Sequence, residues 1–192
     1  MKMVQENSLN AKQIALLIIP VLLLIAFSGF IYWLLIYRKE GQFVGLQFNE
    51  ISFADWGWCA LGLICSMVVL FVFLKIIPMK HMYNPNVRLL ADSFDIRFLA
   101  LYFIPNGFYE ELLFRGTLQP LLGLVPAALI FALVHISYYK KPIILVETFI
   151  QGLVLGVLFQ ITGSIWVTTV AHAAFNTLQT WMIKEDVIKY RL

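Results

Sequence analysis

An apolar run from Ile14 to Tyr37 constrains this chain more than any other feature of its sequence, because it contains no charged residue. At about 1.5 Å of rise per residue, a helix of that length crosses a hydrocarbon core about 30 Å thick. The run is longer than the apolar core of a signal peptide, and no cleavage site followed by a polar mature chain comes after it. The sequence therefore predicts a retained first membrane span.

The composition agrees with a membrane protein. Of the 192 residues, 61% are hydrophobic and 13% are charged, whereas soluble proteins contain roughly 45–50% apolar and about 25% charged residues. The net charge of +3 is better explained by loop residues that orient helices in a bilayer than by nucleic-acid binding. We therefore expect the lipid bilayer as a partner and no nucleic acid.

Further apolar segments follow the first, separated by Pro, Gly and charged residues that end helices. The predicted spans are residues 14–37, 55–78, 94–119, 124–139, 143–162 and 164–183. The predicted fold class is all-α, a polytopic helical membrane bundle with about six transmembrane helices. Within one membrane domain, residues 1–93 supply N-terminal helices and a connection, and residues 94–183 supply the core that contains the polar motifs.

The distribution of Lys and Arg predicts the orientation of this bundle. With the N-terminus inside, eleven of these residues lie on the inner side and three on the outer side. Cytoplasmic loops carry the excess of Lys and Arg, so both termini are expected in the cytoplasm and the protein in the cell membrane. The inner residues are Lys2, Lys12, Lys75, Lys80, Arg88, Arg97, Lys140, Lys141, Lys184, Lys189 and Arg191, and the outer ones are Arg38, Lys39 and Arg115.

Two features within the spans concern helix shape and packing. Pro105 lies inside the third span and is expected to kink it ahead of a pair of glutamates. Gly152 and Gly156 form a small-xxx-small pattern that permits close approach of a neighbouring helix.

A few polar residues fall inside the predicted spans, where an ionised side chain costs on the order of 2.5–3.5 kcal/mol. Such residues are expected to face the bundle interior and to have partners. Glu147, near the start of its span, is either interfacial or a supporting partner. The set is Glu110, Glu111, Arg115, His135, Glu147, His172 and Asn176.

Helical spacing separates the roles of the two glutamates. Glu111 and Arg115 are four residues apart, so they share a helix face and are expected to form an ion pair. Glu110 is rotated from Glu111 by about 100° and remains free for another partner. A charge cluster that locks helices together would explain Glu111 and Arg115, but it leaves Glu110 without a purpose.

The histidines repeat this spacing on two other spans. Phe131 precedes His135 by four residues, and His172 precedes Asn176 by four. Counted from the outer ends of the spans, Glu110, His135, His172 and Asn176 lie within about 6 Å of one another in depth. The sequence therefore predicts a polar site formed by three helices.

This residue set suits hydrolysis. A glutamate beside a histidine can hold and deprotonate water, while a second histidine and an asparagine can donate hydrogen bonds to the oxyanion of a tetrahedral intermediate. These parts predict a peptide-bond hydrolase without a covalent intermediate. Glu110, His135 and His172 are also a possible ligand set for a divalent metal such as zinc. No HExxH motif is present, so a metal is permitted without being specifically indicated.

Three motifs occur in order along the chain: "EELLFR" fits EExxxR, "FALVH" fits FxxxH and "HAAFN" fits HxxxN. Together they resemble the CPBP family of intramembrane proteases, which includes type II CAAX prenyl endopeptidases and bacteriocin self-protection (Abi-like) proteins. The resemblance covers roughly residues 94–182 and implies that residues 94–183 are a CPBP-like catalytic core.

The resemblance implies a role for each residue. Glu110 would activate a water that His135 also holds, His172 and Asn176 would form the oxyanion site, and Glu111 and Arg115 would support the architecture. It implies an intramembrane endopeptidase that acts on a membrane-associated peptide or protein. Family members are described both as glutamate proteases and as metalloproteases, and we favour the glutamate mechanism. The alternatives are a non-catalytic scaffold, a bacteriocin-immunity protein, or transport and proton relay.

Overall fold

The computed structural model describes residues 11–189, with side chains from residue 17 onward. This part of the chain is helical and contains no strand, which confirms the all-α prediction. The long helices are α1 (Ala11–Tyr32), α3 (Phe53–Ile76), α6 (Ile96–Leu113), α8 (Leu124–Leu133), α9 (Pro142–Thr162) and α10 (Ile165–Lys184). The short ones are α2 (Arg38–Glu40), α4 (Met79–Met82), α5 (Pro85–Ser93) and α7 (Gln119–Leu122).

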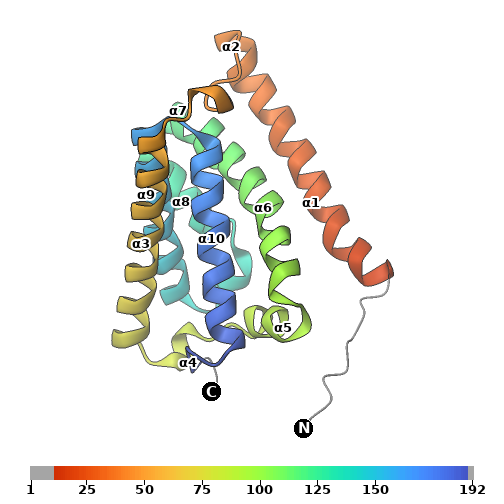
Figure 1. Cartoon of the computed structure of the whole chain (residues 1–192), viewed down its shortest axis with the longest axis vertical. Coiled ribbons are helices and arrows are strands. Elements are labelled where there is room, and N and C mark those ends of the chain that lie inside the picture. The colour runs from red at the N-terminus through yellow and green to blue at the C-terminus, as the bar shows by residue number, and fades with distance from the viewer. Residues whose placement is uncertain (1–10, 190–192) are drawn as a thin grey trace.

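The helices form a bundle in which α10 packs against α3, α5, α6 and α9 (Figure 1). Helix α8 packs on α9, and α1 is inclined to the rest of the bundle and contacts α6. Helix α3 shares apolar clusters with the C-terminal helices, as where Cys59 meets Leu155 and Val167. The segments before and after residue 93 therefore share apolar clusters.

Three helical segments are long and apolar enough to cross a membrane: Leu17–Glu40, Phe53–Ile76 and Pro142–Thr162. Helix α8 is apolar but short, while α6 and α10 carry charged and polar side chains along their length. The helical membrane bundle is thus supported, whereas length and composition do not confirm the count of six spans.

Large apolar side chains cover the outer face of α1. Leu22, Leu23, Phe27 and Phe30 are all more than half exposed. An apolar surface of this extent is unfavourable in water and suited to lipid. The outer helices therefore indicate where the bilayer surrounds the bundle.

The predicted span 124–139 is wrong at its end, because α8 stops at Leu133. His135 has φ −80° and ψ 63°, outside the helical region, and a short 3-10 turn, Ile136–Tyr138, follows it. The last carbonyls of a helix lack partners within the helix. The Phe131 carbonyl acquires one from the His135 side chain at 2.7 Å, which stabilises this early ending.

Helix α6 runs through Pro105 without interruption and continues into a π-helical turn, Phe114–Leu118. Arg115 belongs to this turn. Single π turns inside helices are often found at functional sites. No spacing in the sequence predicted this turn.

Gly152 and Gly156, the small-residue pattern of α9, lie on the face of α9 that packs against α8. A Cβ atom at Gly152 would come within 3.2 Å of Ala128 Cβ, and one at Gly156 would collide with Leu124 and lie 2.8 Å from Gln119 Oε1. Gln119 Nε2 also donates a hydrogen bond to the Gly156 carbonyl at 2.9 Å. The predicted close approach at both glycines is confirmed.

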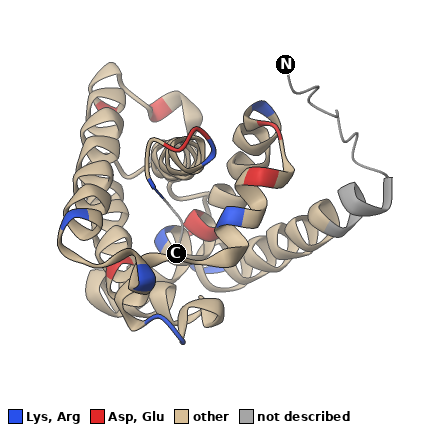
Figure 2. Cartoon of the chain, turned by 90° about the horizontal axis from the view of Figure 1, so that it is seen from below, with Lys and Arg blue, Asp and Glu red and all other residues tan. Residues whose placement is uncertain are grey.

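Several basic residues gather at the end of the bundle where α4, α5 and the C-terminus lie (Figure 1; Figure 2 looks at the bundle from below). Lys141 Nζ donates to the Lys80 carbonyl at 2.6 Å, and Lys184 Nζ donates to the Ala91 carbonyl at 2.9 Å. Their common position agrees with their assignment to one side, and which side this is stays a prediction. Three of the inner set cannot be compared in this way: Lys2 and Arg191 lie outside the described residues, and Lys12 lies outside the described side chains.

Candidate active site

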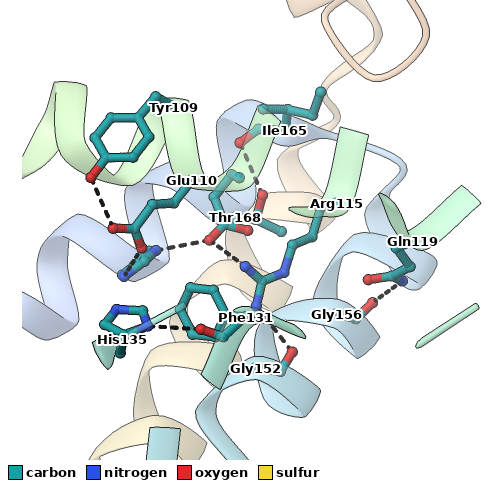
Figure 3. Close-up of polar contacts among 12 residues, drawn as sticks. Tyr109, Glu110, Arg115, Gln119, Phe131, His135, Gly152, Gly156, Ile165 and Thr168 are labelled. Atoms are coloured by element: carbon teal, nitrogen blue, oxygen red, sulfur yellow. Dashed lines mark hydrogen bonds and ion pairs between the residues drawn. The ribbon is translucent and has the colours of Figure 1, made fainter. Parts of the chain in front are cut away.

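A buried ion pair joins Glu111 to Arg115, as the spacing predicted. Arg115 Nη1 donates to Glu111 Oε1 at 3.0 Å, and the two residues are 0% and 1% exposed. Arg115 also donates from Nη2 to the Gly152 carbonyl at 3.0 Å and lies over the Phe131 ring, 4.6 Å from its centre. Figure 3 shows the guanidinium between Phe131 and Gly152. The pair therefore holds α6 and its π turn against α8 and α9.

His172 on α10 meets both glutamates. Its Nδ1 lies 2.8 Å from Glu111 Oε1, and its Nε2 lies 3.7 Å from Glu110 Oε2. An ionised carboxylate only accepts hydrogen bonds, so Nδ1 carries a proton in this arrangement. The bond to Glu111 thus orients the ring and leaves Nε2 toward Glu110. This contact between Glu111 and His172 was not predicted from the sequence, because the two residues are 61 positions apart.

Glu110 differs from its neighbour in its surroundings. Its side chain is 18% exposed, and it accepts a hydrogen bond from the Tyr109 hydroxyl at 3.3 Å (Figure 3). Arg115 is paired with Glu111, so the separate environments expected for the two glutamates are present. Glu110 has the position of a carboxylate that can act on a bound molecule.

His135 reaches the site from the loop after α8. Its Nδ1 is 2.7 Å from the Phe131 carbonyl, and its ring stacks on Tyr138 with centroids 5.3 Å apart. A carbonyl oxygen only accepts, so Nδ1 carries the proton and Nε2 has a free lone pair. Phe131 and His135 are neighbours as predicted, with ring centroids 5.0 Å apart, although His135 is not helical.

A cavity of about 260 Å³ brings the predicted residues together. Glu110, His135, His172 and Asn176 all line it. Glu110 and His135 also line a second hollow that includes Leu24 of α1. These two side chains therefore lie between the bundle interior and the side of the bundle covered by α1.

The possible zinc ligands do not form a metal site in this arrangement. Among the described side chains, no group of three His, Cys, Asp or Glu residues is placed to hold one ion. His135 and His172 each have one ring nitrogen in a hydrogen bond to a protein oxygen, and of these two histidines only His172 is within an ion-pair distance of Glu110, at 3.7 Å. The residues in this arrangement do not fit the zinc set.

The cavity contains a further carboxylate whose position the sequence left open. Glu147 is 6% exposed and lines the cavity from α9, so its side chain faces the bundle interior. Gln151, four residues later, donates from Nε2 to Glu147 Oε1 at 2.8 Å and to the Ser66 carbonyl at 3.0 Å. The same four-residue spacing that predicted the Glu111 pair would have predicted this contact.

Comparison with known proteins agrees with the three motifs. Residues 92–178, which contain all four predicted catalytic residues, match the family described as type II CAAX prenyl endopeptidase, Rce1-like. The uncharacterized protein YpbD of Bacillus subtilis (strain 168) is 33% identical over 83 residues, which cover 43% of this chain and 44% of that protein. No solved structure matches. The resemblance predicted from the motifs is thereby confirmed for residues 92–178, a segment similar to the Rce1-like type II CAAX prenyl endopeptidases.

Proposed function

We propose that the protein is an intramembrane endopeptidase that uses Glu110 to activate water against a peptide bond. The observation that carries the proposal is the position of the Glu110 carboxylate, 3.7 Å from His172 Nε2 and at a cavity that His135 and Asn176 also line. The neighbouring Glu111 is already engaged by Arg115. A scaffold would need the buried pair and would have no use for the second carboxylate.

The first step needs a water molecule held between Glu110 and His135. The free lone pair on His135 Nε2 accepts a hydrogen bond from this water and fixes its orientation. Glu110 takes the proton as the O–H bond breaks, and the oxygen forms a bond to the carbonyl carbon of the substrate. The product of this step is a tetrahedral intermediate with a negatively charged oxygen.

His172 and Asn176 stabilise that oxygen. The carboxylates of Glu110 and Glu111 flank His172 at 3.7 and 2.8 Å. In the proposed step His172 is an imidazolium, in which both ring nitrogens donate. His172 Nε2–H and the Asn176 amide then donate to the oxyanion. As the intermediate collapses, the C–N bond breaks and the proton on Glu110 passes to the departing nitrogen. A carboxylic acid and an amine leave the site.

Glu111 and Arg115 act by positioning. Arg115 fixes Glu111, and Glu111 fixes the His172 ring through Nδ1. A partner on one ring nitrogen fixes the orientation of a histidine and so the direction of its other nitrogen. This accounts for one charged pair buried completely within the bundle.

The substrate class follows from the surroundings of the site. The outer helices are suited to lipid and the cavity lies within the bundle, so we propose a membrane-associated peptide or protein as substrate. The matched family is described as a type II CAAX prenyl endopeptidase, and the chemistry that we propose to be shared with it is cleavage of a peptide bond. We assign the protein to the cell membrane as a multi-pass protein with cytoplasmic termini.

The test is the substitution Glu110→Gln, with Glu50→Gln on an exposed turn as the matched control. Loss of a general base lowers the rate by about 10²–10⁴-fold, so an uncleaved substrate should accumulate in membranes with the Glu110→Gln protein. Both variants should be inserted and melt like the wild type. Full cleavage by the Glu110→Gln protein would refute Glu110 as the base. Full biological activity of that variant, with no cleavage by it or by the wild type, would indicate a scaffold or an immunity protein instead.

A further inference from the structure

A second polar set lines the cavity and has no part in the mechanism above. It consists of Glu147 and Gln151 on α9, with the Ser66 carbonyl of α3 beside them. Glu147 and Gln151 are each 6% exposed. We call this set the α9 subsite.

The α9 subsite has unused acceptors. The amide nitrogen of a glutamine carries two N–H donors. Those of Gln151 Nε2 donate hydrogen bonds to Glu147 Oε1 and to the Ser66 carbonyl. Among the described side chains, Gln151 Oε1 is buried without a hydrogen-bond partner. A buried acceptor without a donor is costly and uncommon. A ligand that satisfies this oxygen must therefore donate a hydrogen bond.

The α9 subsite lies between the catalytic level and one end of the bundle. Gly152 contacts Arg115, whereas α9 begins at Pro142, next to the contact of Lys141 with α4. Glu147 is five residues before Gly152, which is about 7.5 Å along the helix axis. Val87 of α5 and Met82 of α4 line the same cavity. A chain that reaches Glu110 from the α4–α5 end passes Glu147.

We infer that the α9 subsite binds a basic side chain, Lys or Arg, of the peptide substrate. Glu147 supplies a negative charge, and Gln151 Oε1 accepts a hydrogen bond from the same cation. Leu70, Leu74 and Leu155 line the cavity as well and suit the aliphatic stem of such a side chain. A purely structural role explains the bond between Glu147 and Gln151 but leaves Gln151 Oε1 unsatisfied. The inference rests on the proposed function, because it takes a peptide as the ligand.

The test measures peptide binding to the full-length protein in detergent, in the Glu110→Gln background so that nothing is cleaved. The probes are short peptides of Leu and Ala with a single Lys placed at each position in turn, each matched by a peptide with norleucine there. At one or more positions the Lys peptide should bind about tenfold tighter or better. Adding Glu147→Gln should abolish this preference, Glu147→Asp should retain much of it, and Glu50→Gln should leave it unchanged.

Two results would overturn the inference: equal binding of Lys and norleucine peptides at every position, or a Lys preference that survives Glu147→Gln. The comparison of Lys and norleucine peptides needs no substitution in the α9 subsite. It therefore tests the inference even if a Glu147 variant is unstable. Cleavage by the protein with Glu110 intact is measured separately with the same peptides. A Lys preference without any cleavage would contradict the proposed protease function but support the α9 subsite. Cleavage without a Lys preference would support the protease function and contradict the subsite.

Discussion

Replacement of Arg115 by Met tests whether the buried ion pair holds the bundle together. Met keeps most of the length of the side chain and its apolar contact with Phe131 but removes the cation. Glu111 then loses its bond of 3.0 Å, and the Gly152 carbonyl loses its donor, also at 3.0 Å. Glu111 is 0% exposed, so water cannot replace the guanidinium without disturbing the packing.

The size of the effect follows from this burial. Removing one partner of a buried ion pair costs about 3–5 kcal/mol, because the other charge stays buried without its counter-ion. Glu111 then keeps its contact with His172 Nδ1 at 2.8 Å. In a domain of this size each kcal/mol lowers Tm by about 2–4 °C. Arg115→Met should therefore lower Tm by about 6–20 °C.

Thermal unfolding in detergent micelles measures this loss, and Lys39→Met is the matched control. Lys39 also pairs with a glutamate, Glu40, at 3.4 Å, but the two side chains are 73% and 44% exposed. Exposed pairs contribute about 0–1 kcal/mol, so the control should melt close to the wild type. The double variant Glu111→Gln with Arg115→Met should recover part of the loss, since no unpaired charge then remains. An Arg115→Met protein that melts like the Lys39→Met control would refute the argument.

The remaining predictions concern helix packing and metal. Gly156→Ala should lower the free energy of unfolding by about 1–3 kcal/mol, because its Cβ collides with Leu124 of α8; Gly57→Ala, which meets nothing within 4 Å, should cost nothing, and equal melting of the two variants would contradict the close approach. Treatment with EDTA followed by dialysis should leave peptide cleavage unchanged, whereas a loss that Zn²⁺ restores would show that the glutamate mechanism is incomplete.

The sequence by itself determined the features that depend on one helix. The apolar runs required helices suited to a membrane, because an extended backbone cannot satisfy its hydrogen bonds in lipid. The pairing of Glu111 with Arg115 followed from a spacing of four residues, which places both on one face. The small residues of α9 predicted a close helix approach, and α8 supplies it. The last two rest on the geometry of a single helical turn.

Only the tertiary structure decided which helices meet and at what height. The contacts of His172 with Glu111 and of Gln151 with Ser66 join residues 61 and 85 positions apart, and no local spacing encodes them. The sequence likewise did not predict that α8 ends before His135. A run of apolar residues does not show where a side chain will form a hydrogen bond with a terminal carbonyl. Side-chain partners from other helices, rather than helix propensity, place the carboxylates and imidazoles around the cavity.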